Sequence, residues 1–288
     1  MSEQDRYIPG VPCWVDTTQP NPKAAVAFYS ELFGWEFEDL MPAHPVRYYM
    51  ARLRGGDVAA VSLQPAGAPD ASAWNTYVWV DDAAETAAKV RSAGGTVLRE
   101  PADVGDSGRM AVFADPAGAA FCVWQARAHR GAAIVNEPGS LNFNILNTRD
   151  LGRASEFYGA VFGWEILDVG GAPMWALPGY GDFLERRTPG LRQRMADMGA
   201  PKRFEDVVAG INLTADKVPD HWGVTFAVDD ADAVAARAAE LGGRVIAPPF
   251  DAPWARMTIV SDPQGATFTA SKFVPENKDL AQSAGAAR

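Results

Sequence analysis

The stretch FYSELFGWE at residues 28–36 decides the fold, because the chain repeats it as FYGAVFGWE at residues 157–165. Two further motifs recur in the same order. VDDA at residues 80–83 returns at 228–231, and DPAGAAF at 115–121 returns as DPQGATF at 262–268. Ordered matches of this kind are the signature of an internal repeat. We therefore expect two copies of one unit, at about residues 5–126 and 140–274.

Each copy contains the local signals of two helices with strands between them. Asn21 and Pro22 are typical of a helix start, and Gly34 of a helix end. A second helix is predicted from Asp82 to the glycine pair at 94–95. The DPAG turn predicts a hairpin between strands at 110–114 and 120–124. The order strand–helix–strands thus occurs four times along the chain.

The two copies differ in one segment. The repeat spacing grows by 19 residues between the FY and VDD motifs, so the second copy carries an insert, at about residues 183–220. Its charged residues are interrupted by two methionines, and a helix is predicted at about 187–199. A lid over the second cleft and a solvated decorating helix are both open interpretations of the insert. Residues 127–139 are expected to form a surface linker, and 275–288 a flexible tail.

The composition argues against several classes of protein, among them nucleic-acid binders, membrane-spanning proteins and disulfide-rich proteins. The net charge of the 288 residues is −10, which argues against a nucleic-acid partner. No apolar run reaches about 18 residues, so we expect no membrane span, and the polar start is not a secretory signal. Two cysteines, Cys13 and Cys122, cannot form a disulfide framework or a cysteine zinc site. These features favour the cytoplasm as the location.

The four motif-bearing units resemble the vicinal oxygen chelate superfamily, which includes glyoxalase I, bleomycin-resistance proteins and extradiol dioxygenases. The PCWVD start at residues 12–16 and the Trp124-Gln125 ending further resemble actinobacterial two-domain glyoxalase-like proteins. The resemblance implies an α+β fold of two tandem domains. Each domain would pair two βαβββ modules, whose sheets curl into an open barrel around a cleft.

The resemblance also implies where a divalent metal would bind, on the first strand of each module and the last strand of each domain. Those strands offer mostly neutral side chains here, with Cys122 and Thr269 at about the place of the family glutamate. We therefore expect no cofactor and no complete metal triad, although a site with unusual ligands remains open.

Candidate site residues follow from the same strands. His221 is the predicted base, with Glu185 of the insert as a second catalytic group. Arg109 and Arg256, at equivalent places, either grip a ligand oxygen or lie at the surface. His44 and His129 are expected in exposed loops. The predicted ligand-binding residues are Trp14, Asp16, Trp74, Asn75, Arg109, Cys122, Asn142, Asn144, Trp222, Arg256 and Thr269.

Three functions remain open. The first is a glyoxalase-like lyase or isomerase that acts on a small oxygenated or aromatic metabolite without the family metal triad. The second is a binding protein of the bleomycin-resistance type that sequesters such a metabolite. The third is a metal-dependent lyase or dioxygenase with unusual ligands. In each case the partner is a small molecule, and the chain is a monomer or a homodimer.

Overall fold

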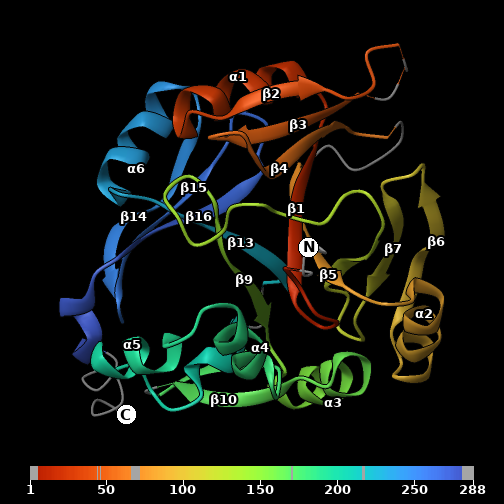
Figure 1. The fold of residues 1–288 in the computed structure, drawn as a ribbon. Helices are drawn as coiled ribbons and strands as arrows, with labels where there is room; N and C mark the ends of the chain where they lie inside the picture. The colour runs from red at the N-terminus through yellow and green to blue at the C-terminus, as the bar shows by residue number, and fades with distance from the viewer. Residues whose placement is uncertain are drawn as a thin grey trace.

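The computed structural model describes residues 6–43, 45, 47–65, 72–169, 171–215 and 218–280 (Figure 1). His44 lies outside the described residues. The chain forms two eight-stranded mixed sheets, one from each copy of the repeat, so the expected α+β architecture of two tandem curled, unclosed sheets is confirmed. None of the helices in these ranges is long and apolar enough to cross a membrane.

Domain 1 contains the first sheet, with strand order β2-β3-β4-β1-β5-β8-β7-β6. Its centre is the antiparallel pair β1 and β5, which joins the two modules. Its strands are β1 (Pro12–Gln19), β2 (Glu36–Asp39), β3 (Tyr48–Leu53), β4 (Gly56–Leu63), β5 (Ala73–Trp79), β6 (Thr96–Val104), β7 (Gly108–Ala114) and β8 (Ala120–Ala126).

Domain 2 repeats this arrangement in the order β10-β11-β12-β9-β13-β16-β15-β14. Here β9 and β13 form the central antiparallel pair. Its strands are β9 (Leu141–Thr148), β10 (Glu165–Val169), β11 (Ala172–Ala176), β12 (Val207–Leu213), β13 (His221–Ala227), β14 (Arg244–Ala252), β15 (Ala255–Ser261) and β16 (Thr267–Phe273).

The helices begin and end at the predicted signals. Helix α1 (Pro22–Phe33) starts where the Asn21 side chain accepts a hydrogen bond from the Ala24 amide, and it ends at Gly34 with φ of +70°. Helix α3 (Leu151–Phe162) has the same capping in the second copy. The shorter helices α2 (Ala83–Ser92) and α6 (Ala231–Glu240) follow the two VDD motifs.

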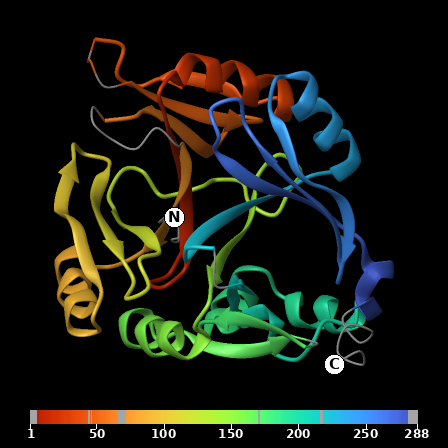
Figure 2. The same ribbon diagram turned by 180° about the vertical axis from the view of Figure 1, so that it is seen from behind.

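The two domains pack through the helix-bearing faces of their sheets. Helix α1 lies beside α6 of the other domain, and α2 lies beside α3 (Figures 1 and 2). The aromatic side chains of α1 pack into domain 2, with Phe33 5.3 Å from Phe226 between ring centroids. Two large apolar clusters, each with residues of both copies, therefore join the domains.

The repeated motifs meet across this interface. The Tyr29 hydroxyl of domain 1 donates to the Asp262 carboxylate of domain 2 at 3.0 Å. In the mirror arrangement, the Tyr158 hydroxyl of domain 2 donates to Asp115 of domain 1 at 3.1 Å. The FY and DPxG motifs thus bind each other between copies.

The segment between the domains differs from the predicted surface linker. Ala132 is fully buried, and its amide donates to the Cys13 carbonyl at 2.8 Å. The Tyr7 hydroxyl in turn donates to the Ala132 carbonyl. The segment is packed because its backbone bonds to β1 and to the N-terminal residues. At the other end of the chain, Pro275–Asp279 form a 3-10 helix, η2, Leu280 is exposed, and residues 281–288 of the predicted flexible tail lie outside the described residues.

The insert differs from its predicted boundaries. The added residues lie between β11 and β12 and contain α4 (Tyr180–Arg187), α5 (Leu191–Asp197) and the 3-10 helix η1 (Phe204–Asp206). The short helix predicted at about 187–199 is present as α5, but it begins only after Gly190, whose φ is +82°, and the preceding helix α4, which Thr188 ends, was not predicted. Just before α4, the Leu177 side chain packs against Gly10 of domain 1.

Candidate functional site

A buried carboxyl group lies at the centre of the inner, concave face of domain 1. Asp16 of β1 is 4% exposed, and its oxygens accept hydrogen bonds from Asn75 Nδ2 and from the Tyr77 hydroxyl, each at 2.8 Å. The Tyr48 hydroxyl of β3 also bonds to Asp16 and accepts a bond from Trp14 Nε1 at 3.3 Å. The sequence-predicted residues Trp14, Asp16 and Asn75 are therefore brought together.

Burial changes the chemistry of this carboxyl group. Desolvation raises the pKa of Asp16 from 3.8 to about 6, although the bonds from Asn75, Tyr77 and Tyr48 act in the opposite direction. All three of these hydrogen-bond partners are neutral. A carboxyl group of this kind can take up and release a proton near neutral pH.

His129 belongs to the same face, and sequence reasoning misplaced it as an exposed loop residue. Its imidazole is packed edge-on against Trp14, with ring centroids 4.5 Å apart, and lies 5.7 Å from the Trp124 ring. Burial lowers its pKa, and its Nε2 atom is buried without a hydrogen-bond partner. No local pattern distinguishes a linker histidine that folds back onto a sheet, so only the tertiary packing could reveal it.

Cys122 lies on the same face of domain 1, near Asp16. It lies beside Tyr77 in the parallel pairing of β5 with β8 and is 3% exposed. Desolvation strongly raises the pKa of both the Cys122 and Cys13 thiols. Neither cysteine has the low-pKa setting of a nucleophile.

We predict that neither thiol reacts with Ellman's reagent in the native protein at pH 8, and that both react in guanidinium chloride. The physical reason is that Cys13 is fully buried and that ionisation of either thiol would place an unsolvated charge in the core. A stoichiometric reaction of the folded chain within minutes would contradict this placement.

The matching face of domain 2 has different chemistry. Ile145 takes the place of Asp16 on the first strand, and it pairs with Gly223 as Asp16 pairs with Asn75. Thr225 and Thr269 stand side by side, in the same pairing as Tyr77 and Cys122. Thr269 was predicted from the sequence. The face is smaller in side-chain volume and carries no buried carboxyl group at these positions.

The strands that would carry the family metal ligands do not fit a divalent cation. On domain 1 they present Trp14, Asn75 and Cys122, and the carboxyl group that bonds to Asn75 there is that of Asp16. Within the described ranges, no group of three histidine, cysteine, aspartate or glutamate side chains converges to hold a metal ion. Chelation of a hard or borderline divalent ion needs such a set.

Three predicted ligand-binding residues lie in the interface between the domains. Trp74 donates from Nε1 to the Tyr29 hydroxyl, and Trp222 donates to the Tyr158 hydroxyl. Asn144 is 2% exposed and accepts a bond from Thr76 at 2.7 Å. Strand alternation places these side chains on the helix-bearing face. Asn142 lies near the linker, where it donates to Asn136.

The two predicted arginines are held at the surface. Arg256 donates to Asp232 at 2.8 Å and to Asp251 at 3.1 Å, and these carboxylates raise its pKa. Arg109 donates to the Pro101 carbonyl at 3.2 Å. Both guanidinium groups therefore donate hydrogen bonds to the protein itself.

The two predicted catalytic residues are not brought together by any described contact. The Glu185 carboxylate accepts the amides of Gly190 and Arg192 at the start of α5, and these bonds lower its pKa. His221 is exposed at the start of β13, with Nδ1 2.8 Å from the Pro219 carbonyl. Two cations of the insert are also paired, Arg192 with Asp182 and Glu205, and Arg203 with Glu165 and Asp206. The lid role of the insert stays a prediction.

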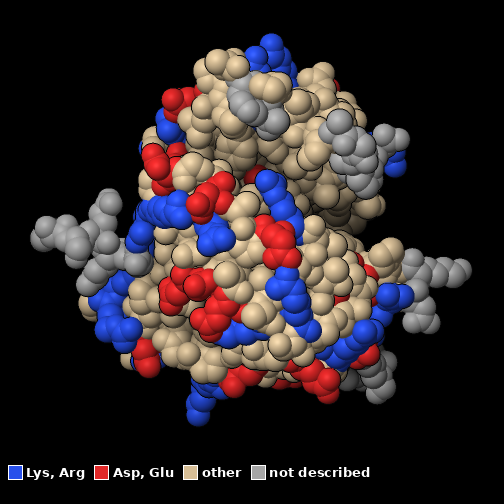
Figure 3. Space-filling model, turned by 90° about the vertical axis from the view of Figure 1, so that its right-hand side faces the viewer, with Lys and Arg blue, Asp and Glu red and all other residues tan. Residues whose placement is uncertain are grey.

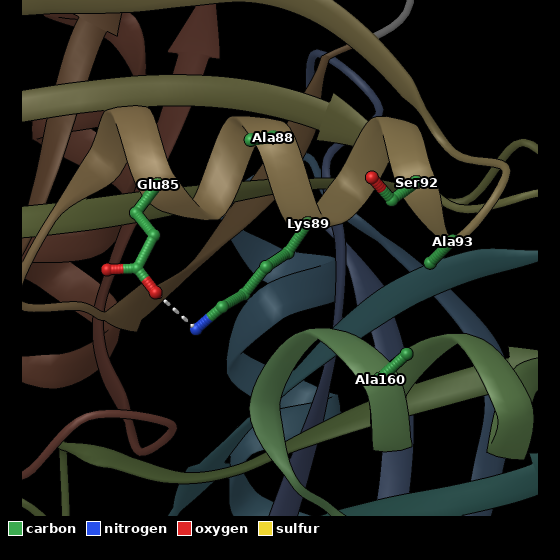
Figure 4. A pocket seen from close by; sticks show the side chains of 6 residues that line it. All are labelled: Glu85, Ala88, Lys89, Ser92, Ala93 and Ala160. Carbon is green, nitrogen blue, oxygen red and sulfur yellow. Dashed lines mark ion pairs between the residues drawn. The ribbon is translucent and has the colours of Figure 1, made fainter.

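Shallow grooves elsewhere carry little chemistry. One of about 320 Å³ lies between α2 and α3, and Figure 4 shows Lys89 bonded to Glu85 of its own helix across from Ala160. At the matching place between α6 and α1, Arg237 pairs instead with Glu31. The groove is thus the space left where alanine replaces an acid, and its lining offers no reactive group.

The charges on one side of the molecule are mixed in sign. Figure 3 faces α2, β6 and β7, and there basic and acidic side chains alternate over the lower part of the described surface. The upper lobe in this view is mostly uncharged, and the surface is hollowed between the two parts. This is the side toward which the sheet of domain 1 curls in Figure 1.

Family models match each copy of the repeat separately. A family model described as "Glyoxalase-like domain" matches residues 14–124, and one described as "Glyoxalase/Bleomycin resistance protein/Dioxygenase superfamily" matches residues 140–269. Among curated relatives, "Putative glyoxylase CFP32" of Mycobacterium tuberculosis is 40% identical over 96% of this chain and 100% of its own length. "Anthracycline biosynthesis protein DnrV" of Streptomyces peucetius is 35% identical over 92% of this chain and 94% of its own length.

Solved structures show the same fold at low identity. The Mn(II)-bound glyoxalase from Novosphingobium aromaticivorans has a TM-score of 0.59 at 16% identity, and the match covers 92% of this chain and 82% of that one. The 2,3-dioxygenase LapB from Pseudomonas sp. KL28 has a TM-score of 0.59 at 13% identity, covering 92% and 93%. At this level of identity the likeness describes the scaffold alone.

Proposed function

Because the chain belongs to the glyoxalase/bleomycin resistance protein/dioxygenase superfamily, we propose that it binds a small oxygenated or aromatic metabolite in the inner face of domain 1 and transforms it by proton transfer. The reaction would be of lyase or isomerase type and would not use the family metal. The observation that carries this proposal is the buried Asp16 carboxyl group, surrounded by neutral donors.

The roles of the surrounding groups follow from their contacts. Asp16 accepts a proton from the bound molecule, and the hydroxyls of Tyr77 and Tyr48 stabilise the carboxylate before that step. Asn75 is only half-buried, so its amide lies at the border between the carboxyl group and the open side of the face. The rings of Trp14 and Trp124 are buried on this face and pack against His129.

One relative supports the chemical class of the ligand. The 35% identical Streptomyces peucetius protein is named for anthracycline biosynthesis, and anthracyclines are oxygen-rich aromatic molecules. By analogy, we propose an oxygenated aromatic compound as the substrate class, with dicarbonyl–thiol adducts as the second class, in line with the glyoxylase name of the 40% identical relative.

The proposal predicts the behaviour of the Asp16→Asn variant. If the protein turns over the hemithioacetal of methylglyoxal and glutathione, the variant should lose at least about 100-fold in kcat, because a general base contributes 10²–10⁴-fold. Turnover should be unchanged by EDTA. The Glu38→Gln variant, which alters an exposed carboxylate on β2 of the same sheet, is the matched control.

The other outcomes separate the remaining functions. Full activity in Asp16→Asn but loss in His221→Ala would overturn the proposal and move the base to domain 2. Complete loss with EDTA, restored by a divalent ion, would favour the metal-dependent alternative. Binding without any turnover would favour a sequestering protein, which is the second candidate because domain 2 has Ile145 at the place of the Asp16 carboxyl group.

A further inference from the structure

The edge strands of the two sheets differ in how they are protected from other chains. Each sheet ends in two edge strands, β2 and β6 in domain 1 and β10 and β14 in domain 2. An edge strand can be met by another chain, and natural proteins commonly guard such edges with charged residues. The edges β2, β6 and β10 follow this rule and carry Glu36, Glu38, Asp39, Arg99, Glu100, Asp103, Glu165 and Asp168.

Strand β14 is the exception. Its charged residues, Arg244 and Asp251, lie near its two ends, and the residues between them, VIAPPF at 245–250, are all uncharged. Val245, Ile246 and Phe250 are 39%, 52% and 39% exposed. The strand therefore presents a continuous apolar strip, about 20 Å long, at the surface. A contiguous strip of this kind marks an interaction site more often than single exposed apolar residues do.

The matched strand of domain 1 shows that the fold does not require this strip. The pairing of β6 with β7 has bulges at the same places as that of β14 with β15, so the two backbones correspond. Strand β6 exposes Leu98 where β14 exposes Ile246, but its next residues are Arg99 and Glu100. Glu100 is ion-paired with Arg91 of α2. Strands β6 and β14 lie at opposite margins of the molecule (Figure 1).

The charges at the ends of the strip are placed to meet those of a second copy. Arg244 comes three residues before Ala247, and Asp251 comes three residues after Pro248. If two β14 strands lie antiparallel about a two-fold axis between Ala247 and Pro248, each Arg244 meets the partner's Asp251. The same arrangement sets the apolar residues of one strip against those of the other. The strip is thus complementary to itself in both charge and polarity.

Both end groups are able to take such a partner. Arg244 is exposed, and within the described residues no carboxylate pairs with its guanidinium group. The Asp251 side chain is 54% exposed. The hydrogen bonds that it accepts from Arg256 and Asn277 both end on Oδ1, so Oδ2 can accept a bond from a second cation.

The two prolines determine the kind of contact. Pro248 and Pro249 have no N–H group to donate, so a continuous ladder of backbone hydrogen bonds cannot form along the centre of the strip. The contact therefore consists of side-chain packing, with a charged pair at each end. One strand edge covers less than the roughly 800 Å² per partner of a stable complex, so association should be reversible at micromolar concentrations.

We propose that two copies of this chain associate through β14 about a two-fold axis, with each Arg244 paired to the partner's Asp251. A two-fold contact buries the same patch on both chains and closes at two copies. It lies outside the candidate site and does not involve Asp16, so it goes beyond the proposed function.

Sedimentation velocity of the full chain, from about 5 µM to about 0.5 mM, tests this contact. We expect the wild type to shift from the mass of one chain to that of two over this range. Ile246→Glu puts a charge from each chain beside the two-fold axis and should raise the dissociation constant at least about 10-fold. Leu98→Glu is the matched control, because it alters the equivalent exposed residue of β6 and should leave the dimer unchanged.

A pair of charge reversals tests the arrangement of the two chains. Arg244→Asp and Asp251→Arg, each alone, should weaken the dimer about 10-fold, because like charges then meet at both ends of the contact. An equal mixture of the two variants should dimerise as the wild type does, because opposite charges meet again at both ends of the mixed dimer. Both side chains are exposed, so both variants should keep the circular dichroism spectrum of the wild type.

Four outcomes would overturn the proposal. The first is a wild type that stays monomeric at about 0.5 mM, and the second is a mass beyond two chains, which a contact without two-fold symmetry would give. The third is a dimer that Ile246→Glu leaves intact, and the fourth is a mixture that associates no better than the separate variants. Asp16→Asn should dimerise as the wild type does, so a failure of the proposed function is distinguished from a failure of this contact.

Discussion

The Asp262→Ala variant is expected to unfold with a free energy about 4 kcal/mol lower than that of the wild type. Asp262 is 2% exposed and accepts bonds from the Tyr29 hydroxyl at 3.0 Å and from Gln19 Nε2 at 2.7 Å, both in domain 1. Its other oxygen accepts two amides of its own turn. Removal takes a partner from four donors, although Gln19 Nε2 keeps its bond to Thr17 Oγ1, and each buried unsatisfied group costs about 1–3 kcal/mol before relaxation.

Urea denaturation, followed by tryptophan fluorescence and circular dichroism, measures this effect. Because the lost bonds join the two domains, both probes should report one transition that moves to lower urea. Tyr29→Phe, which removes a single hydroxyl, is the matched control and should cost about 1–2 kcal/mol. An unchanged midpoint for Asp262→Ala, or a transition in only one probe, would contradict the placement of the FY and DPxG motifs across the interface.

The second large effect concerns pH. The Asp16 pKa is raised from 3.8 to about 6 in the folded chain, so folding favours the protonated carboxyl group. That stabilisation is fully present below pH 3.8 and is lost as the pH rises to about 6. The Asp16→Asn variant lacks this loss. Its free energy of unfolding relative to the wild type should therefore rise by about 2 kcal/mol between pH 4 and pH 7.

Chemical denaturation of both proteins over this pH range provides the measurement. The difference between them cancels the contributions of Asp115 and Asp262, which are buried and have raised pKa values in both proteins. Tyr77→Phe removes one donor to the carboxylate, so the loss of stability should then extend to higher pH. If the difference in free energy of unfolding between Asp16→Asn and the wild type stayed constant from pH 4 to pH 7, Asp16 would not be a desolvated carboxyl group.

The two inner faces show how one repeated backbone supports two kinds of chemistry. The strand pairing is the same at Tyr77–Cys122 and at Thr225–Thr269, but only domain 1 places a carboxyl group beside that pair. Domain 2 instead leaves the Thr225 hydroxyl without a partner. The duplication thus preserves the scaffold, while side-chain size and charge differ at matched positions.

Parts of the candidate site could be predicted from the sequence because the family resemblance implies which strands carry ligands. Trp14, Asp16, Asn75 and Cys122 lie on those strands, and the structure brings them to one face. The same strands offered Asn144, whereas its side chain faces the interface. A shift of one residue moves a side chain to the other face of a sheet, and the bulges in β1 and β9 pairing shift that phase.

The sequence by itself determined the duplication, the helix ends and the hairpin turns, because caps, turns and periodicity act within a few residues of the chain. Only the tertiary structure decided that each FY motif bonds to the DPxG turn of the other copy, and that His129 of the linker packs between two tryptophans. Such contacts join residues distant in sequence. These contacts form because buried polar groups need hydrogen-bond partners and buried rings need packing partners when the two sheets come together.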